Sequence, residues 1–346
     1  MPEPYQQIIE TLATKKRVLV TTHVRPDGDA LGSSAALVLG MKQKGVDADV
    51  LLLSHLPRKY SFIYDDAGVR HIDVEAGFPP DFSLNAYDAL VVVDTGTWSQ
   101  LPGLKERVEQ FRKPKIVIDH HLTQQDWADI KLVDTSAGAC AEIIEDLLER
   151  WGVRLDAAMA TALFVGIVAD TGWFMFSNTR PVTLRRAAKL MEAGVDTDRV
   201  YQLLYQNERA ERIALHTRGL AGMELLDNGR IAVMRIRKSD FAAARAHIND
   251  TENLINLPLQ IRSVEVSVLL SEPMDAGPVR VSLRSKGQVD VARFAEQFGG
   301  GGHARAAGLK FETSIDEAHD KVVSALLART TSTTSTSTTT PSPPRA

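Results

Sequence analysis

Short β-branched runs alternate with longer amphipathic stretches between Arg17 and Val195. The runs are RVLVTT, ADVLLLS, DALVVVD, KIVIDHH and IKLVD, and the helix-like stretch ALGSSAALVLGMKQKG follows the first of them. Parallel strands need crossover connections of helix length, so this alternation is typical of a mostly parallel sheet with helices on both faces. The sequence therefore predicts an α/β fold for this part of the chain.

The rest of the chain predicts a second, smaller domain. With 346 residues, two domains of ordinary size are expected. Residues 1–195 would form the first domain, and the polar, helical segment 196–226 contains no strand-like run and predicts a helical connector. Beyond it, RIAVMRI, VEVSVLL and VRVSLRS predict strands, and VDVARFAEQF and the segment after Ser314 predict helices. Residues 227–330 are thus expected to form an α/β domain, and the Ser/Thr/Pro-rich residues 331–346 a disordered tail.

Composition limits the kind of protein that this is. A formal net charge of -4 disfavours a protein that coats long nucleic acid. The single cysteine, Cys140, lies in an apolar helical pattern and is expected to be buried and inert. The first residues lack a signal-peptide pattern, and no run has the roughly 18 apolar residues of a membrane span. We expect a cytoplasmic protein, and base rates favour a homodimer.

Acids and histidines follow several of the predicted strands. The positions are His23, Asp27, Asp29, Asp94, Asp119, His120, His121 and Asp170. The carboxyl ends of parallel strands gather at one edge of the sheet, where open α/β sheets bind ligands. Two carboxylates 4 Å apart repel by about 4 kcal/mol at an effective dielectric of 20, and a cation removes that repulsion. Each residue alone is more often a loop cap, but together they predict a metal site.

The residue types indicate which metal and which reaction. Carboxylates with a minority of imidazoles and no thiolate suit Mn²⁺, with Mg²⁺ or another divalent ion as alternatives. Two such ions can share a carboxylate and stabilise an in-line displacement at phosphorus. Neighbouring side chains diverge at a strand end, so His120 can bind metal while a protonated His121 contacts the substrate. Ser33 and Ser34 lie in GSSAA, which lacks the G-x-S-x-G pattern of a nucleophilic serine.

The motifs HVRPDGDA, VVVDTG, DHH and VADTGWF resemble, in order, the four motifs of the DHH phosphoesterases. VSLRS and FGGGGHARAAG resemble the associated DHHA1 domain. The resemblance implies that His23 and Asp27 bind one metal ion, that Asp29, His120 and Asp170 bind a second, and that Asp94 bridges them. It also implies a catalytic pair, in which Asp119 orients a ligand and His121 contacts the scissile phosphate.

Within this family, the two-domain layout is similar to the enzymes that degrade nanoRNA and remove the 3'-phosphate of 3'-phosphoadenosine 5'-phosphate (PAP). Glycine backbones can approach an anion closely, and arginine offers a fork of donors. The predicted phosphate-binding residues are Arg262, Arg284, Ser285, Gly300, Gly301, Gly302 and His303, with Arg305 two positions after the last of them. A hinge between the domains would close the second over the first.

Other functions within the family stay open at this point. The metal site would look alike in enzymes that hydrolyse cyclic dinucleotides, pyrophosphate or polyphosphate. A long-DNA exonuclease would need a basic channel, which the acidic composition disfavours. A nucleotide-binding protein without catalysis is a further alternative, although every expected metal ligand is present. The predicted partners are therefore short RNA and PAP, with no long duplex and no membrane.

Overall fold

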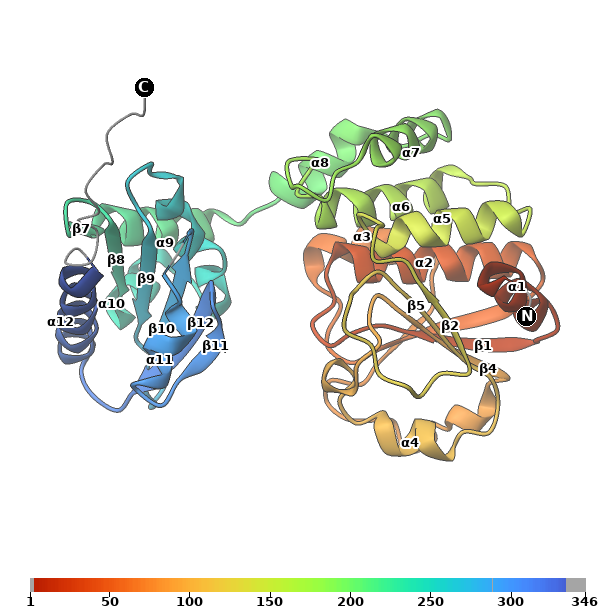
Figure 1. Cartoon of the computed structure of the whole chain (residues 1–346), viewed down its shortest axis with the longest axis horizontal. Coiled ribbons are helices and arrows are strands. Elements are labelled where there is room, and N and C mark those ends of the chain that lie inside the picture. Colours follow the sequence, from red (N-terminus) through yellow and green to blue (C-terminus); the bar gives the residue numbers. More distant parts are fainter. Residues whose placement is uncertain (1–2, 288, 334–346) are drawn as a thin grey trace, which may run out of the picture. The chain divides into compact units, whose positions relative to one another are not determined.

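The computed structural model describes residues 3–287 and 289–333, with side chains described up to residue 328. The described chain forms two compact units, which divide between Asn207 and Glu208 (Figure 1). Residues 331–333 of the predicted tail belong to the last helix, and the rest of that tail lies outside the described residues. No helix in the described ranges is long and apolar enough to cross a bilayer.

The first unit is a fully parallel six-stranded sheet with the order β3-β2-β1-β4-β5-β6. Its strands are β1 (Arg17–Thr21), β2 (Asp47–Leu52), β3 (His71–Asp73), β4 (Ala89–Val93), β5 (Lys115–Asp119) and β6 (Ile130–Val133). Its helices are α1 (Pro4–Ala13), α2 (Gly28–Gln43), α3 (Ser61–Asp65), α4 (Lys105–Gln110), α5 (Cys140–Arg150), α6 (Ala157–Asp170), α7 (Pro181–Glu192) and α8 (Thr197–Tyr205).

The sheet strands are buried on both faces because their residues alternate between two hydrophobic cores. Val91 of β4 packs with α2, α5 and α6, whereas its neighbours Leu90 and Val92 pack with Val108 of α4 on the opposite side. Figure 1 shows α4 on one side of the sheet and α2, α5 and α6 on the other. The expectation of a parallel sheet with helices on both faces is confirmed.

The strand order reverses direction between β1 and β4, which are neighbours in the sheet. From this pair, β2 and β3 extend one way and β5 and β6 the other. Such a switch point leaves a crevice beyond the carboxyl ends of the two central strands, because the following segments diverge to opposite sides. The polar residues after β1 and β4 therefore lie where this type of sheet binds ligands.

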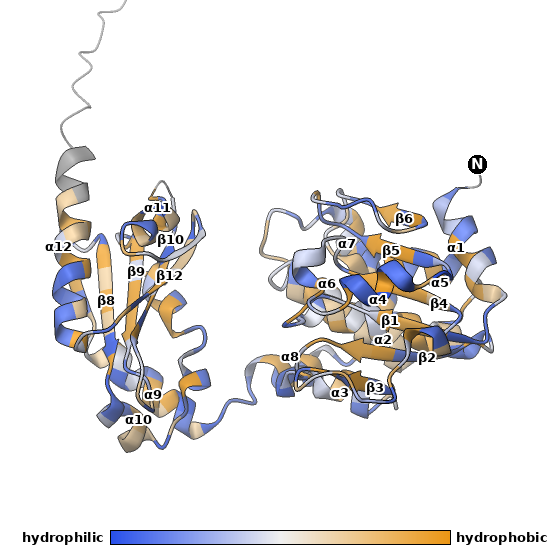
Figure 2. Ribbon diagram, turned by 90° about the horizontal axis from the view of Figure 1, so that it is seen from below, coloured by the Kyte–Doolittle hydropathy of each residue, from blue (hydrophilic) through white to orange (hydrophobic). Residues whose placement is uncertain are grey.

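The second unit is a mixed sheet with the order β11-β12-β10-β9-β8-β7, in which only β8 and β9 are parallel to each other. Its strands are β7 (Glu224–Leu226), β8 (Ile231–Ile236), β9 (Val266–Ser271), β10 (Val279–Ser285), β11 (Gly301–His303) and β12 (Ala306–Phe311). Its helices are α9 (Ala210–Ala221), α10 (Lys238–Ala244), α11 (Val291–Glu296) and α12 (Ile315–Thr333), with 3-10 turns at Ile248–Thr251 and Leu254–Gln260. The hydropathy colouring shows apolar strands in both units (Figure 2).

The segment 196–226 differs from the predicted connector. Its first helix, α8, buries Val200 in the core of the first unit, and its second helix, α9, buries Leu215 in a core of the second. Both helices are amphipathic, and each apolar face needs a core to cover it. The segment is thus divided between the units, and its last residues form strand β7 where no strand was expected.

Candidate metal centre

The predicted metal ligands of the first unit come together at the carboxyl edge of its sheet. His23 lies shortly after β1, Asp94 directly after β4, and His120 directly after β5. Asp27 caps the first turn of α2, accepting hydrogen bonds from the amides of Asp29 and Ala30. Ligand atoms approach within 4.8 Å of one another in three groups. The groups are His23, Asp27 and Asp94; Asp29, His120 and Asp170; and Asp94, His120 and His121.

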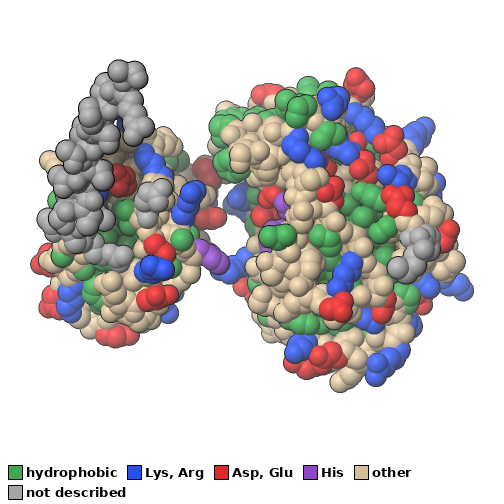
Figure 3. All heavy atoms as spheres, viewed as in Figure 1, with side chains coloured by type: hydrophobic (Ala, Val, Ile, Leu, Met, Phe, Trp, Pro, Cys, Tyr) green, Lys and Arg blue, Asp and Glu red, His purple; other side chains and the backbone are tan. Residues whose placement is uncertain are grey.

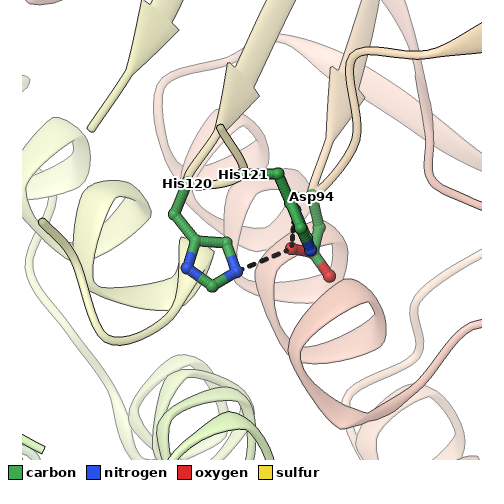
Figure 4. Close-up of side chains that lie close together, drawn as sticks. All are labelled: Asp94, His120 and His121. Carbon is green, nitrogen blue, oxygen red and sulfur yellow. Dashed lines mark ion pairs between the residues drawn. The ribbon is translucent and has the colours of Figure 1, made fainter. Parts of the chain in front are cut away.

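Asp94 occupies the centre of this cluster. Its Oδ2 lies 3.5 Å from Nε2 of His23, and its Oδ1 lies 3.4 Å from Nε2 of His120. Figure 4 shows the imidazoles of His120 and His121 approaching the Asp94 carboxylate. The φ of Asp94 is 62°, a left-handed conformation that aspartate and asparagine tolerate better than most residues. One carboxylate therefore faces two separate groups of ligands.

Backbone carbonyls fix the orientation of two imidazoles in the cluster. His23 places Nδ1 3.0 Å from the carbonyl of Val24, and His120 places Nδ1 3.3 Å from the carbonyl of Ala137. When Nδ1 donates its proton to a carbonyl, the lone pair of Nε2 is left for a metal ion. In both residues it is Nε2 that faces the carboxylates.

Two buried atoms at the centre lack a hydrogen-bond partner within the described part of the chain. They are Oδ1 of Asp94 and Nε2 of His120, the pair that lies 3.4 Å apart. A buried polar atom without a partner is costly in free energy unless a ligand satisfies it. A carboxylate oxygen and an imidazole nitrogen are both ligands for divalent cations. The donor set thus fits a divalent metal ion, and the cluster is a candidate metal centre.

Asp29 has more partners than the prediction of a simple metal ligand implied. It is fully buried, and its carboxylate accepts hydrogen bonds from the amides of Cys140 and Ala141 and from the hydroxyl of Ser33. These amides begin helix α5, so Asp29 also holds that helix against α2. Its Oδ2 remains 3.8 Å from Nε2 of His120. Cys140 is buried at this helix start, as predicted.

The pKa values of several acids and histidines in the cluster are strongly shifted when no cation is bound. Burial and the nearby Asp94 raise the pKa of Asp29 well above its usual value, and burial raises the pKa of Asp170 to about 6. Although burial disfavours a charged imidazole, the carboxylates around His23 and His120 raise the pKa of each histidine to about 10. Protons thus compensate the crowded negative charge that a metal ion would otherwise neutralise.

Metal binding is expected to release protons. Because the pKa of each is raised to about 10, His23 and His120 are expected to be protonated at neutral pH without metal, whereas a metal ion binds only the unprotonated nitrogen. Titrating Mn²⁺ into metal-free protein at neutral pH should release on the order of two protons, and affinity should rise with pH. Calorimetry in two buffers of different ionisation enthalpy measures this number. An equal heat in both buffers would contradict the prediction.

The catalytic pair predicted from the sequence is also in contact. Asp119 is fully buried, and its Oδ1 lies 2.8 Å from Nδ1 of His121. The side-chain amide of Gln124 donates to the other oxygen of Asp119 and to the backbone carbonyl of His121. Because Asp119 contacts Nδ1 of His121, Nε2 of the same ring is left for a substrate. The His121 side chain is half-exposed. Gln124 was not predicted, because only the loop conformation brings it back to Asp119.

Part of the site is exposed at the surface of the first unit. Figure 3 shows histidine and acidic side chains next to each other on that unit. The side chain of Asp170, the last residue of helix α6, is 29% exposed. A ligand therefore reaches the cluster from solvent.

In the second unit, the register aligns predicted phosphate-binding residues in one row. Arg284 of β10 pairs with Ala306 of β12, and Ala306 pairs with His303 of β11. Directly paired residues of antiparallel strands project to the same face, so Arg284 and His303 share a face of the sheet. Helices α11 and α12 cover the other face. Lys286 donates to the carbonyls of Leu259 and Ile261, which ties the exposed turn that carries Arg262 to the end of β10.

Ser285 differs from its predicted role as a phosphate ligand. It is only 6% exposed, and its hydroxyl donates to the carbonyl of Val289. Position 285 has the same parity as the core residues Val281 and Leu283, so its side chain points inward. Ser285 holds the connection that follows β10 rather than presenting a free hydroxyl on the face that carries Arg284.

The glycine run has a structural role that was not predicted from the sequence. Residues 301–303 form strand β11, and a Cβ on Gly300 would lie 2.4 Å from the carbonyl oxygen of Gly308. Gly302 has a φ of 146° and equally little room. A Cβ on Gly301, by contrast, would meet no atom within 4 Å. The glycines at 300 and 302 thus permit the close approach of β11 to β12.

A pair of alanine variants tests this structural role of the glycines. Gly300→Ala is expected to destabilise the second unit by about 1–3 kcal/mol, since the added methyl overlaps the β12 backbone. Gly301→Ala should change stability by less than about 0.5 kcal/mol. Thermal unfolding of the two full-length variants measures the difference. Equal unfolding midpoints would show that the hairpin does not need the close approach.

Comparisons with known proteins agree with this architecture. The family model described as "DHH family, N-terminal domain" matches residues 17–167, and the DHHA1 domain model matches residues 228–330. A relative from Thermus thermophilus, named "Bifunctional oligoribonuclease and PAP phosphatase NrnA", is 31% identical over 342 residues, covering 95% of each chain. The chain belongs to the DHH family. The expected DHH phosphoesterase with a DHHA1 domain, similar to the NrnA type, is confirmed.

Two further comparisons extend this result. The NrnA of Bacillus subtilis is 27% identical and covers 92% of this chain and 96% of its own. A solved structure of an exopolyphosphatase-related protein from Bacteroides fragilis has a TM-score of 0.80 and 22% identity. That match covers 94% of this chain and 96% of the other, and it supports the two-unit fold alone.

Proposed function

We propose that the protein hydrolyses RNA of about two to five nucleotides to mononucleotides and removes the 3'-phosphate of PAP. It would use two divalent cations, with Mn²⁺ as the first choice and Mg²⁺ as the alternative. The observation that carries the proposal is Asp94, whose two oxygens face two separate ligand groups. The names of the NrnA relatives support the choice of substrates.

The proposed division of labour follows from the contacts in the first unit. When bound, the cations would supply water activation and charge stabilisation at phosphorus. His23 and Asp27 would hold one ion, Asp29, His120 and Asp170 the other, and Asp94 both. The His121 imidazolium, held through Nδ1 by Asp119, would bind a phosphoryl oxygen through Nε2. As the P–O bond breaks, that Nε2 would give its proton to the leaving oxygen.

The second unit would bind the end of the substrate. Arg284 and His303 share a face of the sheet, and together with Arg262 they offer donors to a terminal phosphate. A long polyanion would need an extended basic channel, whereas a formal net charge of -4 favours a ligand that is met locally. We therefore propose that substrate length is limited to a few nucleotides.

A substrate panel tests the proposed function. The purified, Mn²⁺-loaded protein would be incubated with pApA, an RNA pentamer, an RNA of tens of nucleotides, PAP, cyclic di-AMP and pyrophosphate. Rapid release of mononucleotides from pApA and the pentamer, with little from the long RNA, is expected. Preference for cyclic di-AMP or pyrophosphate would overturn the substrate choice, and no hydrolysis of any substrate would favour a nucleotide-binding protein.

Arg284→Ala tests the proposed phosphate contact. Hydrogen bonds to charged groups contribute about 1.5–3 kcal/mol, so KM for pApA should rise roughly 10- to 100-fold with little change in kcat. The control is Arg293→Ala, which removes an exposed arginine of helix α11 whose partner is Asp290. An unchanged KM in the Arg284 variant would refute this contact.

Location and assembly are part of the same proposal. We propose a cytoplasmic enzyme, in keeping with a single buried cysteine and substrates that arise from RNA turnover. A homodimer stays a prediction from base rates, and light scattering of the purified protein measures it.

A further inference from the structure

A strained turn follows the metal-ligand residue Asp170. Three successive residues, Gly172, Trp173 and Phe174, have φ values of 57°, 56° and 66°. Left-handed backbone is readily adopted by glycine but is an outlier for bulky side chains, and such strain concentrates at functional sites. The turn is ordered by buried Thr171, whose hydroxyl donates to the carbonyl of Ile167 and accepts from the amide of Phe174.

The turn sends neighbouring aromatic side chains in opposite directions. Trp173 and Phe174 pack inward, with ring centroids 6.0 and 6.2 Å from that of Phe164. The next two side chains point outward, since Met175 is 80% exposed and Phe176 is 57% exposed. Exposed apolar side chains contribute little to folding. The strained backbone thus displays a phenyl ring instead of burying it.

The Phe176 ring is held in one place. Its amide donates to the carbonyl of Thr171, and three of its ring atoms lie within 2.6 Å of the position that a Cβ on Gly172 would occupy. The ring therefore lies directly on the Gly172 backbone, and any side chain at this position would displace it. No aromatic or cationic partner of the ring is found within the described residues. One side of the ring is supported and more than half of its surface is open.

The ring is also close to the metal centre. Gly172 is two residues from Asp170, a separation of roughly 7 Å at most, and Asp170 lies 3.3 Å from His120. Asn178 ties this segment down, because its side-chain amide donates to the carbonyls of Gly138 and Asp170. In a nucleotide, one ribose separates the phosphate from the base. If the phosphate of a substrate is at the metal centre, its base would therefore lie near this ring.

We propose that Phe176 is a stacking platform for a nucleobase of the substrate. The inference rests on the proposed function and adds a base-binding subsite to it. Every nucleobase has a flat aromatic face, so a rigid phenyl ring binds bases with little sequence preference. This chemistry suits an enzyme that must degrade short RNA of any sequence.

Kinetics with a matched pair of substrates test the proposal. One substrate is pApA. The other is the same dinucleotide with an abasic ribose in place of one adenosine, prepared separately for each of the two positions, and the corresponding form is the one that lacks the stacked base. Loss of one stack should raise KM for pApA roughly 5- to 100-fold in Phe176→Leu. The same variant should leave KM for the corresponding abasic dinucleotide unchanged, and Phe176→Tyr should restore the pApA value. The control is Leu184→Ala, which removes an exposed apolar side chain of α7.

A binding measurement without turnover separates this inference from the proposed function. Fluorescence of 2-aminopurine in a dinucleotide falls when the base stacks, and metal-free protein prevents cleavage. We expect quenching with the wild-type protein and with Phe176→Tyr, and none with Phe176→Leu. Equal quenching by Phe176→Leu would overturn the stacking platform, even if the enzyme hydrolyses pApA. Failure of every substrate in the hydrolysis panel would instead overturn the proposed function.

Discussion

Asp94→Asn is expected to lower kcat by at least about 1,000-fold while the protein remains folded. Loss of a single electrostatic contact at a reacting centre commonly lowers kcat by about 100- to 1,000-fold. Asp94 faces both ligand groups, so its neutralisation weakens both. Asparagine is the right replacement because it tolerates the φ of 62° at this position, whereas alanine would add backbone strain. Initial rates on pApA at saturating Mn²⁺ measure the effect.

The unfolding temperature of this variant, unlike its kcat, should stay close to the wild-type value when no metal is bound. In metal-free protein the Asp94 carboxylate repels Asp29 and Asp170, and it raises the pKa of both. Removing its charge relieves that repulsion, but it also removes a carboxylate that holds the His23 and His120 imidazoliums. Because these two effects oppose each other, the unfolding temperature without metal should change little. The control is Asp49→Asn, since Asp49 is a buried acid of β2 that is ion-paired with Arg17 and Arg70. That variant should lose stability and keep its activity, and a metal-loaded Asp94→Asn protein with wild-type kcat would refute the shared-ligand mechanism.

The parallel sheet and its polar edge were predictable because both depend on local sequence. β-branched runs that end in Asp94 or in Asp119 identify strands, and parallel strands place their carboxyl ends together. The predicted groups of metal ligands therefore lie close together as soon as the sheet is parallel. The inward position of Ser285 was also readable from the alternation of Val281 and Leu283, although the motif suggested a phosphate contact.

Features that depend on distant pairing were not predictable in this way. A run of glycines has no preference for strand structure, and β11 forms because residues 301–303 pair with β12. Gln124 reaches Asp119 only through the path of its loop. The left-handed turn at Trp173 and Phe174 opposes the intrinsic preference of both residues, so only the surrounding packing specifies it. These exceptions lie at or beside the proposed substrate sites, where function tolerates locally unfavourable structure.

Asp119→Asn is expected to lower kcat by about 100- to 10,000-fold, the range of general acid–base contributions. The carboxylate of Asp119 accepts a hydrogen bond from Nδ1 of His121 and thereby orients the ring. This hydrogen bond raises the pKa of His121, so the imidazolium persists to higher pH than in a free histidine. If the imidazolium is the active form, activity is present below this pKa and is lost as the pH rises through it. In the variant the pKa falls, and the loss of activity should begin at a lower pH.

The pH profile of kcat/KM at saturating Mn²⁺ distinguishes this role from simple support of the metal site. A weaker metal site would be rescued by more Mn²⁺, whereas a misoriented or deprotonated His121 would not. Because the two residues act as one unit, the double variant Asp119→Asn/His121→Asn should be no slower than His121→Asn alone. Multiplicative losses in the double variant, or an unshifted pH profile in Asp119→Asn, would mean that Asp119 acts independently of His121. The acid of the DHH motif would then serve the backbone amides of His120 and His121, which also donate to it.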